Sequence, residues 1–221
     1  MRTIRVTGKG QIKVKPDMTR ISISLEGTFS EYQETLRRSS EDTEQIKDLL
    51  SKLGFAKSDL KTLNFGVDTE YESYKDKGVY KQRFVGYKYN HSMKVEFESD
   101  NVRLGKVLYA LANCPLHPEF RLSYTVKDQE AAKNQLLGKA VKDAKEKSVV
   151  LTQAAELKLK SIQSVDYSWG QINLEVQPMN RMLAAEECCP TVADGFGSYD
   201  INIEPDDIEV SDTVTVIWEI E

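Results

Sequence analysis

The longest hydrophobic alternation in the chain runs from Val85 to Phe97 and reads VGYKYNHSMKVEF. Apolar or aromatic side chains occupy every second position, and polar side chains such as Lys88 and Lys94 lie between them. A period of two is typical of a β-strand with one buried face. A strand of about 14 residues at about 3.3 Å per residue spans about 46 Å. The alternation therefore predicts a strand that projects beyond a compact sheet.

The segment before this strand predicts a hairpin. Residues 63–71 alternate in the same way, and 73–82 are polar with Gly78 among them, so we expect a loop over 73–82. The hairpin carries five tyrosines, which are Tyr71, Tyr74, Tyr80, Tyr87 and Tyr89. Exposed aromatics on a projecting ribbon are typical of protein–protein interfaces, whereas aromatics on a core-facing strand are core residues. Both interpretations stay open at this point.

The N-terminal residues predict a second pair of strands. Apolar residues alternate over 4–14 and again over 21–25, with Pro16 between them. Proline has no N–H and a fixed φ, so it belongs in a turn, and we expect the two strands to pair antiparallel. Gly8 and Gly10 lack the following helix and the spacing of a phosphate-binding loop, so we interpret them as a turn or bulge.

Three segments have the spacing of amphipathic helices. The first is predicted over 30–53, with Ser30 as its N-cap and Gly54 as its left-handed C-terminal residue. The second is predicted to begin at Asp100 and to end before Pro115.

The third helix is predicted over 129–157, with Asp128 as its N-cap. Its apolar stripe contains small residues such as Ala140 and Ala144, which allow close approach to a sheet or to a neighbouring helix. Further strands are predicted over 120–126, 162–169 and 208–220.

These elements predict an α+β fold, a mostly antiparallel sheet of long strands with three helices packed on one face. Their order is ββα-ββα-βα-β-loop-β, and the half-polar strands suit a sheet covered on one side. We expect a single domain over 1–221. An irregular segment, about 170–203, precedes the last strand, because the periodicity fails there.

Composition limits the classes of partner. The formal net charge is −5 and the pI about 5.3, which disfavours nucleic acid as a partner because phosphate binding needs a basic surface. No apolar run reaches the ~20 residues of a membrane span, and no leader peptide is visible. The sequence as it stands predicts a cytoplasmic protein, or a periplasmic or other extracytoplasmic one if a leader has been removed.

Few residues suggest chemistry. His91 and His117 are the only histidines, and neither has a cysteine or carboxylate at metal-ligand spacing. We interpret His91 as a satisfied core or interface residue and His117 as exposed. Cys188 and Cys189 are candidate redox thiols, because they lie in the irregular segment where a thiol can be accessible. The sequence predicts no catalytic, cofactor-binding or metal-binding residues, and no cofactor.

The chain opens with VTGKGQIKVKPD at residues 6–17. This segment resembles the V-x-G-x-G-x-x-x-V-x-P-D opening of the SIMPL domain family, which includes YggE-like and periplasmic immunogenic protein-like members. Further similarities follow in the family's order, and they are Leu53-Gly54, Leu63-Asn64-Phe65, Gly86-Tyr87, Asp128-Gln129-Glu130-Ala131, Ala140 to Ala144, Ile208-Glu209-Val210-Ser211 and Thr213-Val214-Thr215-Val216. The resemblance covers nearly the whole chain.

The resemblance implies an α+β fold, no established enzyme activity, and ring- or channel-like homo-oligomers in some members. We therefore expect a non-enzymatic, self-assembling protein linked to stress response, whose contacts involve the tyrosine hairpin and the C-terminal segment. The alternative is a redox-responsive or metal-capturing protein that uses Cys188 and Cys189.

Overall fold

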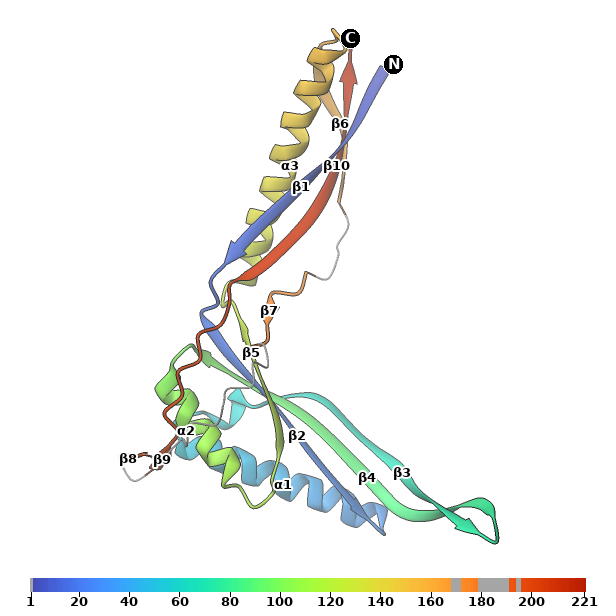
Figure 1. Cartoon of the computed structure of the whole chain (residues 1–221), viewed down its shortest axis with the longest axis vertical. Coiled ribbons are helices and arrows are strands. Elements are labelled where there is room, and N and C mark those ends of the chain that lie inside the picture. The colour runs from blue at the N-terminus through green and yellow to red at the C-terminus, as the bar shows by residue number, and fades with distance from the viewer. Residues whose placement is uncertain (1, 168–171, 179–190, 194–195) are drawn as a thin grey trace. The chain divides into compact units, whose positions relative to one another are not determined.

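The computed structural model describes residues 2–167, 172–178, 191–193 and 196–221 (Figure 1). The elements in chain order are β1 (Arg2–Val14), β2 (Met18–Phe29), α1 (Tyr32–Lys52), the 3-10 helix η1 (Lys57–Asp59), β3 (Lys61–Asp76), β4 (Val79–Glu98), α2 (Asn101–Ala112), β5 (Glu119–Thr125), α3 (Gln129–Ala154), β6 (Leu159–Tyr167), β7 (Glu175–Val176), β8 (Thr191–Ala193), β9 (Phe196–Ser198) and β10 (Ile208–Ile220). The α+β class, with antiparallel strands and three α-helices in the described residues, is confirmed.

The chain forms two compact units that are interleaved in sequence. The first unit comprises Met1–Asp17, Thr125–Val176 and Pro205–Glu221, and the second comprises Met18–Tyr124 and Gln177–Glu204. The long strands are divided between two sheets, so the three helices do not share one sheet. The prediction of one domain over 1–221 stays a prediction.

The first unit is a three-stranded antiparallel sheet of order β1-β10-β6, with α3 packed on it. β1 pairs with β10 without a register shift, from Arg2 opposite Ile220 to Val14 opposite Ile208. Val6, Val214, Val216 and Trp218 form a buried cluster with Ala140 and Ala144 of α3. This burial of apolar side chains between helix and sheet holds the unit together.

Two glycines of β1 let α3 lie directly on the strand. A Cβ atom on Gly8 would be 2.1 Å from the Ala140 carbonyl oxygen, and one on Gly10 would be 2.2 Å from the Leu136 carbonyl oxygen. The predicted close approach of the small residues in α3 is therefore confirmed. The interpretation of Gly8 and Gly10 as a turn or bulge is wrong, because both lie inside the unbroken β1–β10 pairing.

The predicted pairing of the first two strands is also wrong. β1 pairs with β10, and β2 pairs with β4. The Asp17 N–H donates to the Thr125 carbonyl at 3.2 Å, and an Asp17 carboxylate oxygen accepts from the Lys127 N–H at 2.8 Å. These bonds hold the segment after Pro16 against a distant part of the chain, so it does not reverse into a hairpin.

In the second unit β4 lies between β3 and β2, and β5 follows on the other side of β2. α1 packs on β2 and β4. The core contains side chains from this sheet, from both helices and from the segments that follow them, and they are Ile21, Ile23, Leu25, Ile46, Leu50, Phe55, Leu60, Tyr89, Met93, Val95, Phe97, Leu104, Val107, Leu111 and Cys114. The alternation that predicted the strand over 85–97 therefore reflects a face buried against α1.

Helix ends with a local signal are predicted well. The Asp100 carboxylate accepts from the Val102 N–H at 2.8 Å, and Asp128 accepts from the Ala131 N–H at 2.8 Å, so both N-caps are confirmed. Gly54 has a φ of +82°, as a left-handed C-terminal residue requires.

Two other predicted helix ends are wrong. Ser30 is not the N-cap of the first helix, because β2 runs on to Phe29 and the helix begins at Tyr32 after Glu31. The third helix ends at Ala154 rather than at 157, and Glu156 has a φ of 54° that a helix cannot continue through.

The hairpin between β3 and β4 differs from its prediction. The expected loop over 73–82 is wrong, because pairing continues to Asp76 opposite Val79. The turn consists of Lys77 and Gly78, with φ angles of 48° and 86°, which suit the two-residue hairpin turns that match strand twist. The polar composition of 73–82 led to the prediction of a loop. A pair of strands with both faces in solvent is equally polar, so composition did not distinguish the two.

The irregular segment predicted over 170–203 contains β7, β8 and β9 in its described parts. Cys188 and Cys189 lie outside the described residues. None of the helices that the structure describes is long and apolar enough to cross a membrane.

Candidate functional site

The β3–β4 hairpin continues past the strand beside it. β2 ends at Phe29, opposite Tyr87 of β4, whereas β3 and β4 pair with each other as far as Asp76 and Val79. We call residues 71–85 the ribbon, and Figure 1 shows it leaving the sheet of the second unit. The predicted projection of the long strand is therefore confirmed within this unit.

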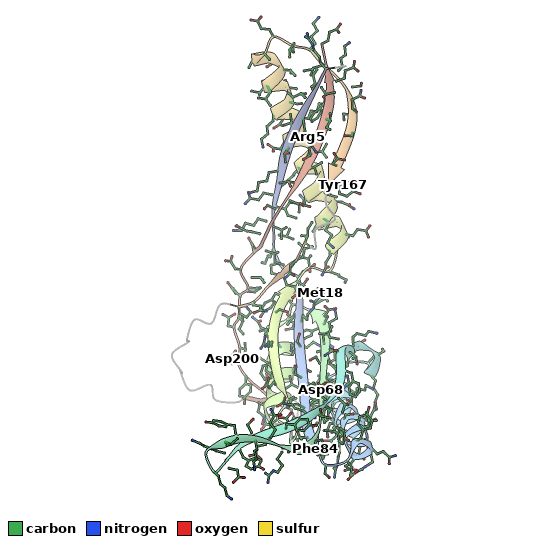
Figure 2. All side chains as sticks on the ribbon, turned by 90° about the vertical axis from the view of Figure 1, so that its right-hand side faces the viewer. Arg5, Met18, Asp68, Phe84, Tyr167 and Asp200 are labelled. Carbon is green, nitrogen blue, oxygen red and sulfur yellow. The ribbon has the colours of Figure 1, made fainter. Side chains whose placement is uncertain are left out.

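Four aromatic rings follow one another from the start of α1 onto the ribbon. Tyr32 contacts Tyr87 edge to face at 5.4 Å between centroids, Tyr87 contacts Phe84 at 5.4 Å, and Phe84 contacts Tyr71 at 5.7 Å. Figure 2 shows Phe84 on the ribbon. Contacts of this kind contribute about 0.5–1.5 kcal/mol each beyond area burial. We call Tyr32, Tyr71, Phe84 and Tyr87 the aromatic ladder, and they order one another although three of them are exposed.

The five tyrosines fall into two groups. Tyr89 is 1 % exposed and its hydroxyl donates to the Asp42 carboxylate, so it is a core residue. Burial, and then the Asp42 carboxylate, raise the pKa of Tyr89 well above its ordinary value. Tyr71, Tyr74 and Tyr80 are 52 %, 43 % and 77 % exposed, and Tyr87 is half-buried. Tyr71, Tyr74 and Tyr80 are the part of the predicted interface that lies on the surface.

The ribbon has two different faces. Tyr80 lies opposite Lys75, and strand alternation places Lys75 on the same face as Tyr71. Tyr74 lies on the other face, where ion pairs join Arg83 to Glu72 at 2.7 Å and Lys81 to Asp76 at 2.6 Å. Tyr71, its partner Phe84 and Tyr80 therefore share one face of the ribbon.

The charge of the ribbon is opposite to that of the chain. It contains Lys75, Lys77, Lys81 and Arg83 against Glu72 and Asp76, a formal charge of +2, while the whole chain carries −5. A basic ribbon attracts acidic surfaces.

A groove lies between α1 and the edge strand β3, because α1 packs mainly on β2 and β4. Its volume is about 370 Å³. We call it the α1–β3 groove, and its lining residues are Leu36, Ser39, Ser40, Thr43, Glu44, Lys47, Thr62, Phe65 and His91.

His91 lies at this groove with both ring nitrogens bonded. Nδ1 is 2.9 Å from the Thr43 hydroxyl, and Nε2 is 2.9 Å from the Thr62 hydroxyl. The Thr43 hydroxyl donates its one hydrogen to the Ser39 carbonyl at 2.7 Å, so it accepts from Nδ1–H of His91. In the neutral ring, Nε2 then accepts from the Thr62 hydroxyl.

Burial, and then the charge of Lys47, lower the pKa of His91. His91 is therefore the satisfied core residue that the sequence predicted, joining α1 to β3. His117 is exposed, as predicted, and has a φ of 45°.

Two other polar residues of the groove, Ser39 and Lys47, are also bonded within the chain. The Ser39 hydroxyl donates to the Leu36 carbonyl at 2.8 Å, and Lys47 donates to Glu44 at 2.7 Å. Leu36 and Phe65 remain 36 % and 46 % exposed. The free surface that the groove presents is therefore mainly apolar.

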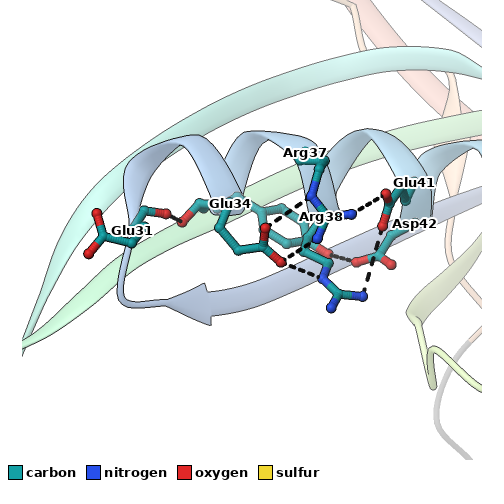
Figure 3. A network of polar contacts seen from close by, with 8 residues as sticks. Glu31, Glu34, Arg37, Arg38, Glu41 and Asp42 are labelled. Atoms are coloured by element: carbon teal, nitrogen blue, oxygen red, sulfur yellow. Dashed lines mark hydrogen bonds and ion pairs between the residues drawn. The ribbon is translucent and has the colours of Figure 1, made fainter.

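Figure 3 shows a charged network on α1. Helical spacing places it on a different side of α1 from the residues that line the groove. Glu34 bonds Arg37 at 2.6 Å and Arg38 at 2.8 Å, and Arg37 also bonds Glu41 at 2.6 Å. The two arginines lower the pKa of Glu34. These exposed pairs are solvated helix surface rather than a reactive cluster.

The described part of the chain contains no group of three or more His, Cys, Asp or Glu side chains that could hold a metal ion. Cys114 is buried and free. The candidate redox thiols Cys188 and Cys189 lie outside the described residues.

Sequence reasoning missed two features of this site. Phe84 and Tyr32 belong to the aromatic ladder, and Thr43 and Thr62 hold His91. Each feature joins residues from different elements, and no local pattern marks such a meeting.

Comparison with known proteins gives a consistent result. The profile of the SIMPL family, described as "Protein of unknown function (DUF541)", matches residues 4–218. Two curated relatives are both named "26 kDa periplasmic immunogenic protein", one from Brucella melitensis biotype 1 and one from Brucella abortus strain S19. Each is 22% identical over 209 residues, covering 90% of this chain and 82% of the relative.

Proposed function

This chain belongs to the SIMPL family, whose function is unknown. From the structure we propose that it is a non-enzymatic protein that self-assembles through its ribbon. The resemblance expected from the segment VTGKGQIKVKPD is confirmed by the family match. The single observation that carries the proposal is the ribbon itself, a basic, aromatic pair of strands that no other strand in the described residues flanks.

The exposed rings support a role in protein contact. Aromatic side chains are enriched in the centres of protein interfaces, where they bury large areas with few rotamers to fix. Tyr71, Phe84 and Tyr80 are 52 %, 44 % and 77 % exposed, although the ladder holds two of them in place. An isolated two-stranded hairpin is also marginal in water, so a partner that covers the ribbon stabilises it.

The size of the surface limits the affinity. Tyr32, Tyr71, Tyr80 and Phe84 are exposed, and covering half of the roughly 200 Å² of each ring removes about 400 Å² from water, which contributes about 10 kcal/mol. Association costs at least about 4 kcal/mol, which leaves at most about 6 kcal/mol and a dissociation constant of at least about 40 μM for one contact. Assembly should therefore depend on concentration at tens of micromolar and above.

Light scattering coupled to size-exclusion chromatography tests the proposal. We expect species larger than the 25.1 kDa chain, with an average mass that rises with loading concentration. A constant mass of one chain at concentrations up to several times the estimated dissociation constant would rule out self-assembly.

Two further proposals come from the family resemblance rather than from the geometry. One is a link to oxidative stress. It is tested by comparing the growth under peroxide of a strain that lacks the gene with the growth of the same strain after complementation. The other concerns location. The two relatives are named as periplasmic. Fractionation of cells that produce the native protein tests the location, because it shows whether the cytoplasmic or the periplasmic fraction contains this chain.

The second candidate function is redox response or metal capture at Cys188 and Cys189. It is favoured by two adjacent thiols in a segment without strand or helix periodicity. Intact-mass measurement after exposure to peroxide or zinc tests it, with the Cys188→Ser, Cys189→Ser double variant as control. Equal mass gains in the wild-type protein and the double variant would exclude Cys188 and Cys189 as the site of oxidation or metal binding.

A further inference from the structure

We propose that the end of the ribbon that carries Tyr80, called the ribbon tip, occupies the α1–β3 groove of a second copy. Tyr80 then packs between Leu36 and Phe65 of that copy. This inference rests on the proposed self-assembly and specifies which two surfaces meet. The apolar surface of the groove, the exposure of Tyr80 and the reach of the ribbon point to it.

The groove suits an aromatic side chain from a protein. The ring nitrogens of His91 and the hydroxyls of Ser39 and Thr43 are already bonded within the chain. A small polar ligand would find few free partners among them. Leu36 and Phe65 instead present apolar surface, which gains free energy when another apolar side chain covers it.

Tyr80 has the matching chemistry. It is 77 % exposed, the most exposed aromatic side chain in the part of the chain that the structure describes. Its ring provides apolar area, and its hydroxyl can face the charged rim formed by Glu44 and Lys47. Tyrosine suits such a site because one end is apolar and the other end is polar.

The groove cannot be filled by the ribbon of its own chain. Phe65 and Lys75 lie on the same strand, and Lys75 is opposite Tyr80. The intervening ten residues or so of strand span about 33 Å, so the tip lies far from its own groove. A second copy is needed to bring the two surfaces together.

Charge adds little to this contact. The ribbon has a formal charge of +2, whereas the charged residues that line the groove are Glu44 and Lys47, whose charges cancel. The contact therefore depends on the burial of apolar surface. Each copy would use two different surfaces, so the contacts form closed rings or open chains, depending on whether the rotation closes.

Photo-crosslinking tests which surface the ribbon tip meets. Tyr80 is replaced by p-benzoylphenylalanine in nitrogen-15-labelled protein, which is mixed with unlabelled protein, irradiated and mapped by mass spectrometry. We expect crosslinks from position 80 of one copy to peptides within 32–52 or 61–67 of the other. The same replacement at Tyr74, on the opposite face of the ribbon, is the matched control and should give at least fivefold fewer of them.

The groove is tested separately with Leu36→Glu. Val141→Glu is its matched control, because both positions are 36 % exposed on helices. We expect Leu36→Glu to raise the dissociation constant of assembly at least tenfold and Val141→Glu less than twofold, with unchanged circular dichroism in both. If the protein assembles but position 80 crosslinks elsewhere and both variants assemble equally, this inference is wrong and self-assembly stands. If the wild-type protein stays monomeric, both fail.

Discussion

Replacing Gly8 by alanine tests the packing of α3 on β1, because the sign of the effect depends on that packing. A Cβ at Gly8 would lie 2.1 Å from the Ala140 carbonyl oxygen and 2.3 Å from the Ala144 nitrogen. Both atoms are helix backbone and cannot rotate away. Ordinary contact begins at 3.4 Å, so α3 must move by about 1.3 Å or the strand must bend.

Such overpacking costs about 1–3 kcal/mol and more where backbone must move, so we expect Gly8→Ala to lower the free energy of unfolding by about 3 kcal/mol. Without the contact, alanine would stabilise the strand by about 0.5–1 kcal/mol relative to glycine. The two expectations differ in sign. For a chain of this size, 3 kcal/mol corresponds to a fall in Tm of about 6–12 °C.

Thermal unfolding followed by circular dichroism measures this difference. Gly66→Ala is the matched control in a strand, and Gly138→Ala is the control in α3, because an added Cβ meets nothing within 4 Å at either position. Both controls should keep or raise the Tm. A Gly8→Ala variant as stable as the wild-type protein would refute the close packing of α3 on β1.

Three further predictions test single contacts. His91 is neutral in the fold and its pKa is lowered by burial and then by Lys47, so protonation opposes folding. Its contribution to stability is complete above the unfolded pKa of about 6.5 and is lost as pH falls below it. Denaturant titrations between pH 7.5 and 5.5 should show a smaller loss for His91→Gln than for the wild-type protein, and equal slopes would contradict the buried, neutral ring. Tyr89→Phe leaves Asp42 without its hydroxyl donor and should lower the free energy of unfolding by about 1–2 kcal/mol, whereas Tyr71→Phe, at an exposed ring, should change it by less than about 0.5 kcal/mol. Asp128→Ala removes the N-cap bond to Ala131 and should cost about 1 kcal/mol, measured by chemical denaturation, while Asp128→Asn should preserve most of it.

The features that the sequence predicted well are those that depend on residues close together in the sequence. Asp100, Asp128 and Gly54 each act within one helical turn, and each is where the sequence placed it. The α+β class follows from alternation and helical spacing in the same way.

Pairing over long separations was not predictable. Thr7 meets Thr215 across the β1–β10 pair, a separation of 208 residues, and their hydroxyls are 2.9 Å apart. Pro16 is typical of a turn between paired strands and equally of a chain that passes from one sheet to another. Gly8 and Gly10 gain their meaning only when Leu136 and Ala140 lie above them.

The candidate site shows the same limit. Tyr80 and Tyr89 lie on one strand, yet one is 77 % exposed and the other 1 % exposed. α1 covers Tyr89 and supplies Asp42 to its hydroxyl, whereas the ribbon at Tyr80 has passed the end of β2. Periodicity identifies the face of a strand, but it does not show where the covering element stops.

The central claim, that exposed ribbon aromatics drive self-assembly, is tested most directly by sedimentation equilibrium. The variant replaces Tyr71, Tyr80 and Phe84 by serine, and a control replaces the equally exposed Val150, Leu151 and Ile162 of the first unit by serine. We expect the wild-type protein and the control to associate at concentrations of tens of micromolar and above, and the ribbon variant to remain at the mass of one chain. Equal association of all three proteins would contradict the claim, and so would a wild-type protein that stays at 25.1 kDa.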